Sequence, residues 1–215
     1  SDLSRMSTLI IDYGMGNLRS VQKAFECIGE PAVISSDPQD LATAERVVLP
    51  GVGAFRDAIE AIHRHDLASA IRDHIAANRP FLGICLGLQL LFDRSLEDGE
   101  HAGLGIIPGT VRRFELPAEF KIPHMGWNQL QPARSPAPAL LQGLPDKPWF
   151  YFVHSYHCVA EDSDWVAATA DYGGPFLAVV ARGNVMATQF HPEKSQAAGM
   201  QLLRNFLEAT RTAQV

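Results

Sequence analysis

A cysteine between two glycines is the residue whose setting most favours covalent chemistry. Residues 83–87 read Gly-Ile-Cys-Leu-Gly; the apolar run at 81–84 predicts a buried strand and residues 86–92 predict a helix. Small neighbours let the backbone bend sharply and lift a nucleophile clear of a sheet. Amides at a helix N-terminus stabilise a thiolate, and the N–H of Leu86 is placed to hold an oxyanion. The alternative for Cys85 is a structural cysteine at a strand end.

A nucleophilic thiol needs a base, and His191 is the best candidate. The segment at 189–193 reads Gln-Phe-His-Pro-Glu after a β-type run. In an extended segment, residues two apart project to the same side, so Glu193 is expected to hold Nδ1 of His191 and leave Nε2 facing the thiol. The long separation from Cys85 is no objection, because catalytic triads assemble in space.

A glycine loop at residues 50–53, Pro-Gly-Val-Gly, ends another strand. Glycine lets backbone amides approach a ligand closely, so this loop is a candidate to complete an oxyanion hole. The alternative is an ordinary turn between a strand and a helix.

The remaining histidines and cysteines lack the spacing of a metal site or a disulfide framework. Solvated helix surface is expected for three histidines: His63, His65 and His74. Two have no ligand-spaced companion, His101 and His124, and core packing is expected for His154 and His157 unless the site is nearby. The cysteines are interpreted as reduced thiols, with Cys27 packing from a helix. Residues 12–17 lack the third glycine of a dinucleotide fingerprint, so NAD binding is rejected.

The elements that position these residues belong to one soluble-type domain. A chain of 215 residues with 47% hydrophobic and 20% charged residues fits a single domain, residues 1–215, in which residues 1–5 are a possible tail. The net charge of −6, with no long basic run, argues against a nucleic-acid partner. The longest apolar stretch, residues 81–92, contains Gln89 and is too short to cross a membrane. Because no secretion signal is evident, a cytoplasmic location is expected.

The first half alternates strands and helices. Strands are predicted at 8–11, 47–49 and 81–84; helical spacing covers 18–28, with Asn17 as N-cap, and 59–75. This order predicts an α/β fold, a mostly parallel open sheet with helices on both faces, of flavodoxin-like type. Its site should lie at the C-terminal ends of the strands.

The second half is rich in short β-type pieces separated by Pro, Gly and Asn turns. An antiparallel or mixed arrangement is therefore expected. The predicted pieces are residues 106–114, 127–130, 149–159, 165–170, 177–182 and 185–189. Residues 131–148 are expected to form a surface loop, and a closing helix is predicted around 202–207.

Three motifs in this order, each at a strand end, carry a family resemblance. They are the glycine loop at 50–53, the cysteine turn at 83–89 and His-Pro-Glu at 191–193. The chain thereby resembles the class I (triad) glutamine amidotransferases over roughly residues 8–207. Within them, it is most similar to the glutaminase subunits of imidazole glycerol phosphate synthase, of histidine biosynthesis. The segments that narrow the resemblance are residues 12–17, 123–128 (Pro-His-Met-Gly-Trp-Asn) and 151–156.

The resemblance implies a glutaminase mechanism. Cys85 would attack the side-chain amide of L-glutamine, His191 would move the proton to the departing ammonia, and Glu193 would orient His191. A glutamyl thioester would form and be hydrolysed to glutamate. The resemblance also implies oxyanion and substrate contacts from Val52, Gly53, Leu86, Gln89 and Tyr156. No metal or organic cofactor is implied.

The resemblance also implies a partner. Ammonia would pass to a (βα)8-barrel synthase subunit in a heterodimer, since the chain ends 22 residues after Glu193 and has no room for a fused synthase. The partner surface is expected around residues 123–128 and 155–156, with Lys194 pairing a charge across it. The chain alone is expected to be a poor glutaminase.

Other assignments remain open at this point. The glutaminases of anthranilate or GMP synthesis share the triad but usually not the Pro-His-Met-Gly-Trp-Asn segment. A stand-alone cysteine hydrolase of the γ-glutamyl hydrolase type would use a similar cysteine turn. A binding module without activity would require a broken triad, whereas all three triad residues are present.

Overall fold

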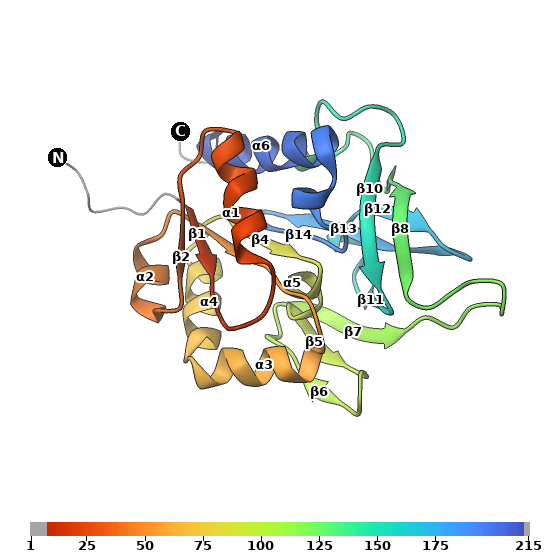
Figure 1. The fold of residues 1–215 in the computed structure, drawn as a ribbon, viewed down its shortest axis with the longest axis horizontal. Coiled ribbons are helices and arrows are strands. Elements are labelled where there is room, and N and C mark those ends of the chain that lie inside the picture. The colour runs from red at the N-terminus through yellow and green to blue at the C-terminus, as the bar shows by residue number, and fades with distance from the viewer. Residues whose placement is uncertain (1–7, 213–215) are drawn as a thin grey trace.

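A twisted, mostly parallel sheet forms the centre of the computed structural model, which describes residues 8–212 (Figure 1). The possible tail, residues 1–5, lies outside the described residues. Five strands run parallel, in the order β2 (Ala32–Ser35), β1 (Thr8–Ile11), β3 (Arg46–Leu49), β4 (Phe81–Ile84) and β14 (Val185–Thr188). Three antiparallel strands extend it: β13 (Pro175–Arg182), β12 (Val166–Asp171) and β9 (Gln131–Pro132).

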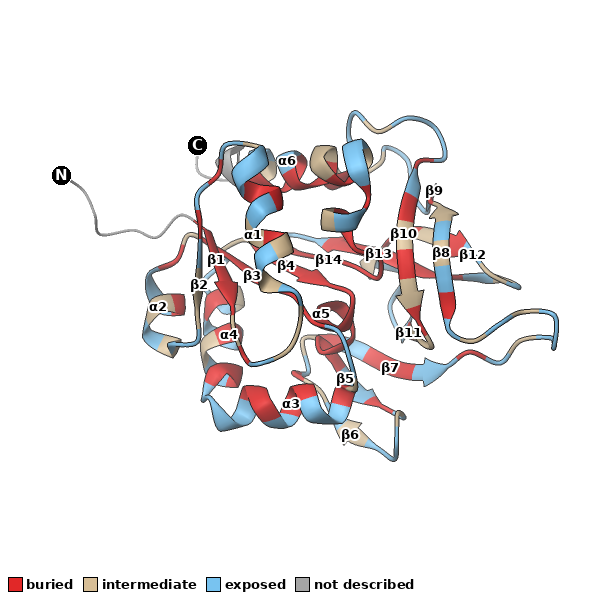
Figure 2. Cartoon of the chain, in the orientation of Figure 1, coloured by how far each residue is buried: buried red, intermediate tan, exposed pale blue. Residues whose placement is uncertain are grey.

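Helices cover both faces of this sheet, as Figure 1 shows. The helices are α1 (Leu18–Cys27), α2 (Pro38–Thr43), α3 (Phe55–Arg64), α4 (Leu67–Ala76) and α6 (Gln196–Thr212). Alternate residues of one strand face opposite sides: Leu9 and Ile11 belong to the core that α3 and α4 cover, whereas Ile10 belongs to the core beneath α1 and α6. The central strands are therefore buried along their length (Figure 2). The predicted α/β fold is confirmed.

The predicted boundaries of the first helix also hold. Helix α1 begins after Asn17, whose side chain accepts from the N–H of Ser20 at 3.3 Å. This satisfies an amide at the helix start that has no partner within the helix.

Two smaller sheets stand beside the C-terminal ends of the parallel strands, as the mixed second half predicted. One has the order β11 (Tyr156–Ala160), β7 (Ile107–Arg113), β5 (Phe92–Ser95) and β6 (His101–Ala102). The other pairs β8 (His124–Gln129) with β10 (Trp149–His154). The β-type piece predicted at 149–159 is present as two strands, because β10 ends before Ser155 and the chain then passes from one of these sheets to the other.

Several local predictions are also wrong. The helix predicted at 86–92 is short: α5 spans Leu86–Gln89, and the chain enters β5 at Phe92. Every residue from 81 to 92 is buried, so hydrophobic periodicity could not mark where the helix ends. Strand β2 and helix α2 were not predicted. The segment 131–148 contains β9 and a 3₁₀ turn, η1 (Ala139–Leu141), whose Leu140 is buried and accepts from Asn205 at 3.0 Å.

The side-chain environments differ from prediction at two positions. Cys27 is exposed, because it lies on the outer face of α1. His74 is buried rather than solvated, and its Nε2 lies 2.8 Å from the carbonyl oxygen of Pro80. His63 and His65 are exposed, as predicted.

Among the described residues, no helix is long and apolar enough to span a membrane.

Candidate active site

Cys85 occupies a strained turn between β4 and α5. Its φ is 55° and its ψ is −109°, a conformation that residues with a side chain rarely adopt. The flanking glycines make the turn possible, since a Cβ on Gly83 would lie 2.7 Å from the carbonyl oxygen of Gly87, and one on Gly87 would collide with the carbonyl of Leu49. The predicted glycine-flanked cysteine turn is present.

His191 and Glu193 form a buried pair at the end of β14. The Nδ1 of His191 lies 2.7 Å from Oε1 of Glu193, and both side chains are 3% exposed. The route differs from the predicted extended segment: residues Pro192–Lys194 form a 3₁₀ turn, η3, that begins just after His191 and brings the carboxylate back to the ring. The expected contact therefore forms through a turn.

The electrostatic setting of His191 couples it to Cys85. Burial lowers the pKa of His191, but the neighbouring Cys85 and Glu193 raise it more, to about 10. The raised pKa favours the imidazolium form of His191, which can donate a proton to a departing group. Within the described part of the chain, Nε2 of His191 is buried and has no hydrogen-bond partner. The ring is thus oriented by Nδ1 and leaves Nε2 for a reacting group.

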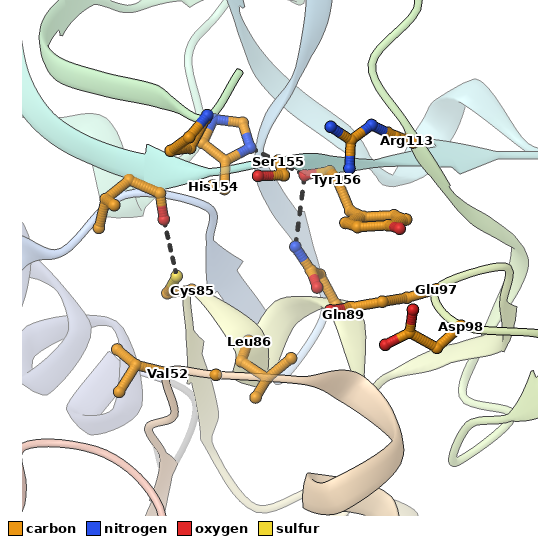
Figure 3. A pocket seen from close by; sticks show the side chains of 13 residues that line it. Val52, Cys85, Leu86, Gln89, Glu97, Asp98, Arg113, His154, Ser155 and Tyr156 are labelled. Carbon is orange, nitrogen blue, oxygen red and sulfur yellow. Dashed lines mark hydrogen bonds between the residues drawn. The ribbon is translucent and has the colours of Figure 1, made fainter.

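A cavity of about 450 Å³ opens beside the cysteine (Figure 3). Its lining includes Cys85 together with the five other positions predicted to bind oxyanion or substrate: Val52, Gly53, Leu86, Gln89 and Tyr156. The cysteine is buried at the cavity wall, and its Sγ lies 3.9 Å from the carbonyl oxygen of Val153. The structure thus brings all the predicted site residues to one place.

Charged residues that the sequence did not single out line the same cavity. Glu97 and Asp98 lie on one side and Arg113 on the other (Figure 3). Burial raises the pKa of Glu97, and its Oε2 accepts from the N–H of Phe55 at 3.3 Å. These side chains come from a turn and a strand end that look like solvated surface in the sequence, so no local signal identified them.

Gln189 is a further neighbour of the thiol that sequence reasoning missed. Its Nε2 lies 3.9 Å from Sγ of Cys85, and its Oε1 accepts from Nε2 of Gln89 at 3.3 Å. It is fully buried and stands two residues before His191. That position at the end of the same strand was the available signal.

The glycine loop holds an orientation that withholds the predicted oxyanion donors. The N–H of Leu86 donates to the carbonyl oxygen of Gly51 at 3.3 Å. The peptide bond that follows Gly51 is trans, so the N–H of Val52 points away from Leu86. The hydroxyl of Tyr13 donates to the carbonyl of Pro50 at 2.7 Å from beneath the loop. The two groups of amides are close together but are not aimed at one point.

Within the described residues, no group of three or more His, Cys, Asp or Glu side chains has the arrangement of a metal site. The ionisable side chains that line the cavity are a thiol, an imidazole, two carboxylates, a guanidinium and a phenol, and the thiol lies beside the His191–Glu193 pair. This set suits acyl transfer to a cysteine.

Comparison with known proteins agrees with this chemistry. The family description "Glutamine amidotransferase class-I" matches residues 9–210. The chain is 56% identical to the imidazole glycerol phosphate synthase subunit HisH of Rhodopirellula baltica, covering 93% of this chain and 96% of that one, and 52% identical to the HisH of Aquifex aeolicus, covering 94% and 96%.

Solved structures show the same fold at low sequence identity. The PurLQS structure from Thermotoga maritima has a TM-score of 0.75 at 20% identity and covers 95% of this chain and 98% of that chain. A GMP synthase subunit from Thermoplasma acidophilum has a TM-score of 0.71 at 18% identity, covering 98% and 96%. With its family match and its HisH relatives, this chain belongs to the class-I glutamine amidotransferase family.

Proposed function

We propose that this chain is the glutaminase subunit of an imidazole glycerol phosphate synthase. It would hydrolyse L-glutamine and deliver ammonia to a synthase partner in histidine biosynthesis. The single observation that carries the proposal is the buried assembly of Cys85, His191 and Glu193, in which Cys85 lies in the wall of the cavity. The HisH relatives, at 50–57% identity over nearly the whole chain, favour this subunit over the glutaminases of anthranilate or GMP synthesis and over a γ-glutamyl hydrolase.

The reaction starts with the thiolate of Cys85. Its Sγ attacks the amide carbon of the glutamine side chain, and the His191 imidazolium transfers its proton to the amide nitrogen. The C–N bond breaks, ammonia leaves, and a γ-glutamyl thioester remains on Cys85. His191 then takes a proton from water, and the resulting hydroxide attacks the thioester and releases glutamate. Glu193 holds the ring in the orientation that both steps need.

The charges around the cavity suit free glutamine. An α-amino acid carries an ammonium and a carboxylate next to each other, beyond the reacting amide. We assign the ammonium to Glu97 and Asp98 and the carboxylate to Arg113, which line the cavity on either side. The orientation of the molecule then places its side-chain amide toward Cys85.

The partner surface is proposed on the two-stranded sheet of β8 and β10. Met125 is 64% exposed and Trp127 is 44% exposed, and both lie on one face, opposite Val153 and Tyr151 of the neighbouring strand. Lys194, which directly follows Glu193 in the sequence, is exposed. Large exposed apolar side chains of this kind mark protein interfaces. We propose that a (βα)8-barrel synthase subunit occupies this surface and that the complex is located in the cytoplasm.

The bond between Leu86 and Gly51 suggests how the partner controls activity. Rotation of the peptide between Gly51 and Val52 would release the N–H of Leu86 and turn the N–H of Val52 toward the reacting carbonyl. Glycine at position 51 permits this rotation. A resting state that lacks these donors prevents glutamine from being hydrolysed when no acceptor is bound.

A glutaminase assay tests the proposal. The purified chain and its synthase partner, supplied with L-glutamine, are expected to release glutamate and to form product from the synthase acceptor. Glutaminase activity without any product from the synthase acceptor would favour another amidotransferase. Hydrolysis of γ-glutamyl peptides but not of free glutamine would favour the hydrolase alternative.

A further inference from the structure

A continuous chain of hydrogen bonds joins strand β8 to the cysteine. It starts at Asn128, passes through the rings of His124 and His154, and reaches the carbonyl oxygen of Tyr156. From there it continues through the side-chain amides of Gln89 and Gln189 to Sγ of Cys85. The two histidines have no place in the reaction steps above, although both are only 6% exposed and His154 lines the cavity.

Backbone groups determine which atoms donate and which accept in the first half of this hydrogen-bond network. A carbonyl oxygen only accepts, so Nδ1 of His154, 2.8 Å from the carbonyl of Tyr156, carries a proton. Its Nε2 is then the acceptor for Nδ1–H of His124, at 3.0 Å. The Nε2 of His124 in turn accepts from Nδ2 of Asn128, at 3.4 Å. Both rings are therefore neutral Nδ1–H tautomers.

Asn128 is the first residue of this hydrogen-bond network, and the orientation of its side-chain amide is fixed. Its Nδ2 also donates to the carbonyl of Asp171 at 2.8 Å, and its Oδ1 accepts from the backbone N–H of Gln129 at 2.8 Å. Because a carbonyl only accepts and an N–H only donates, this side chain cannot be turned around without losing both bonds. Two backbone groups thus fix the orientation of the first side chain of the hydrogen-bond network.

The same reasoning determines the donors and acceptors in the second half of the network, from Tyr156 to Cys85. The carbonyl of Tyr156 accepts from Nε2 of Gln89 at 3.4 Å, as Figure 3 shows. The second proton of that nitrogen goes to Oε1 of Gln189, so the Nε2 of Gln189 is left to donate to the thiol of Cys85. Among the described residues, no hydrogen bond engages Oε1 of Gln89, which remains as an acceptor at the cavity wall.

The neutral state of both rings is consistent with their surroundings. Burial lowers the pKa of His124 to about 4, and burial, more than any other cause, lowers the pKa of His154 to about 3. The rings of Phe114, Phe152 and Phe176 pack around the pair. A protonated ring would present two donors to its neighbours and break the sequence of donors and acceptors.

We infer that His124 and His154 are positioning residues for glutamine binding, which hold the carbonyl of Tyr156 and thereby the side-chain amide of Gln89 at the cavity wall. His154 supplies the bond that fixes this carbonyl at the break between β10 and β11. His124 fixes the tautomer of His154. Their effect on substrate rests on the proposed glutaminase function, whereas the arrangement of protons does not.

The chain of bonds also begins on the strand of the proposed partner surface. His124 and Asn128 lie on the inner face of β8, and Met125 and Trp127 alternate with them on the outer face. Displacement of β8 by a partner would therefore be transmitted to the Gln89 amide. From the sequence, His124 had no companion at metal-ligand spacing, and core packing was expected for His154 unless the site was nearby.

The arrangement of protons is tested by nitrogen NMR of the full chain labelled with ¹⁵N at its histidine rings, at neutral pH. Both His124 and His154 are expected as neutral Nδ1–H tautomers, although free imidazole side chains favour Nε2–H. An Nε2–H tautomer or an imidazolium at either ring would overturn the inference. This readout needs no glutaminase activity, so it fails independently of the proposed function.

The positioning role is tested by steady-state kinetics of the chain combined with its synthase partner. H154F removes the donor to Tyr156 and keeps the ring, so KM for glutamine is expected to rise about tenfold, as for the loss of one hydrogen bond, while kcat stays within about threefold. H154N restores an amide donor close to the Nδ1 position, and KM should return to within about threefold.

The matched control is H157F, on the neighbouring strand, whose ring stacks on Phe114 and lies outside the chain of bonds. Its KM should equal that of the wild type. An unchanged KM in H154F, or an equal loss in H154F and H154N, would overturn the positioning role. Should H154F fail to fold, H154N alone decides: a tenfold higher KM contradicts the inference.

Discussion

The amide N–H of Leu86 donates to the carbonyl oxygen of Gly51 at 3.3 Å. Leu86 directly follows Cys85, the proposed nucleophile, so its N–H is the donor best placed to hold a tetrahedral oxyanion formed on that residue. In this arrangement a backbone carbonyl occupies that donor. The proposed active site therefore has its thiol, imidazole and carboxylate assembled, while the proposed oxyanion donor at Leu86 is occupied.

Activation by the partner is the first expected consequence. The loss of one oxyanion donor costs on the order of 10²–10³ in rate, so glutamate release by the purified chain should rise at least about a hundredfold when the ligand-loaded synthase partner is added. The assay is glutamate production with and without that partner. Full activity of the lone chain, unchanged on addition of the partner, would contradict this account of control.

The base and its orienting carboxylate should differ in importance. His191→Ala should lower kcat by about 10²–10⁴, the usual contribution of a general base. Glu193→Gln should be milder, because an amide at this position still contacts Nδ1 of His191. Both effects are read from kcat of the complex with saturating glutamine. Rates within about threefold of wild type for both variants would exclude the pair from catalysis.

Glu97 is expected to act in substrate binding. Glu97→Gln removes the negative charge that we propose binds the α-ammonium group of glutamine. KM should therefore rise about tenfold with little change in kcat. The matched control is Glu100→Gln, an exposed carboxylate that pairs with Arg94 at 3.0 Å. Equal KM values in the two variants would remove Glu97 from the binding site.

The buried histidine pair should make stability depend on pH. The pKa of His154 is lowered to about 3 in the folded chain, so the unfolded state binds its proton first as the pH falls below about 6.5. Above about pH 6.5 this histidine costs the folded state nothing. As the pH falls from there toward the folded-state pKa, the free energy of unfolding decreases by at most about 1.4 kcal/mol per pH unit. His191, whose pKa is raised to about 10, contributes a slope of opposite sign that lies mainly above pH 6.5 and is the same in a variant changed only at His154.

Urea unfolding at pH 7, 6 and 5 measures this dependence. The free energy of unfolding of the wild type should fall more steeply with decreasing pH than that of His154→Asn, which has no proton to take up at this position. Parallel slopes for the two proteins would show that His154 is already charged in the folded state.

The contacts among the proposed catalytic residues could be predicted because their signals are local. The cysteine turn needs glycines next to Cys85, and Glu193 stands two residues from His191, so both contacts are encoded within short segments. The central strands at 8–11 and 81–84 were equally clear, since a buried parallel strand is a continuous apolar run.

Other features could not be predicted, because only the tertiary fold creates them. Glu97 and Arg113 reach the cavity from a turn and a strand end, and nothing in their local sequence distinguishes them from ordinary polar residues. Gln189 contacts the thiol of Cys85 only because the fold brings the end of β14 beside β4. The end of α5 was hidden because the residues on both sides of it are buried and apolar. The bond from Leu86 to Gly51 depends on a backbone rotation, which residue types alone do not specify.

The most direct test of the central claim is the Cys85→Ser variant in the assembled synthase, assayed with glutamine and, separately, with an ammonium salt as the nitrogen source. Loss of glutamate release, together with retained synthesis from ammonium, is the predicted result, because only the glutaminase step uses the thiol. Glutamine-dependent turnover that survives the substitution would contradict the assignment of Cys85 as the nucleophile.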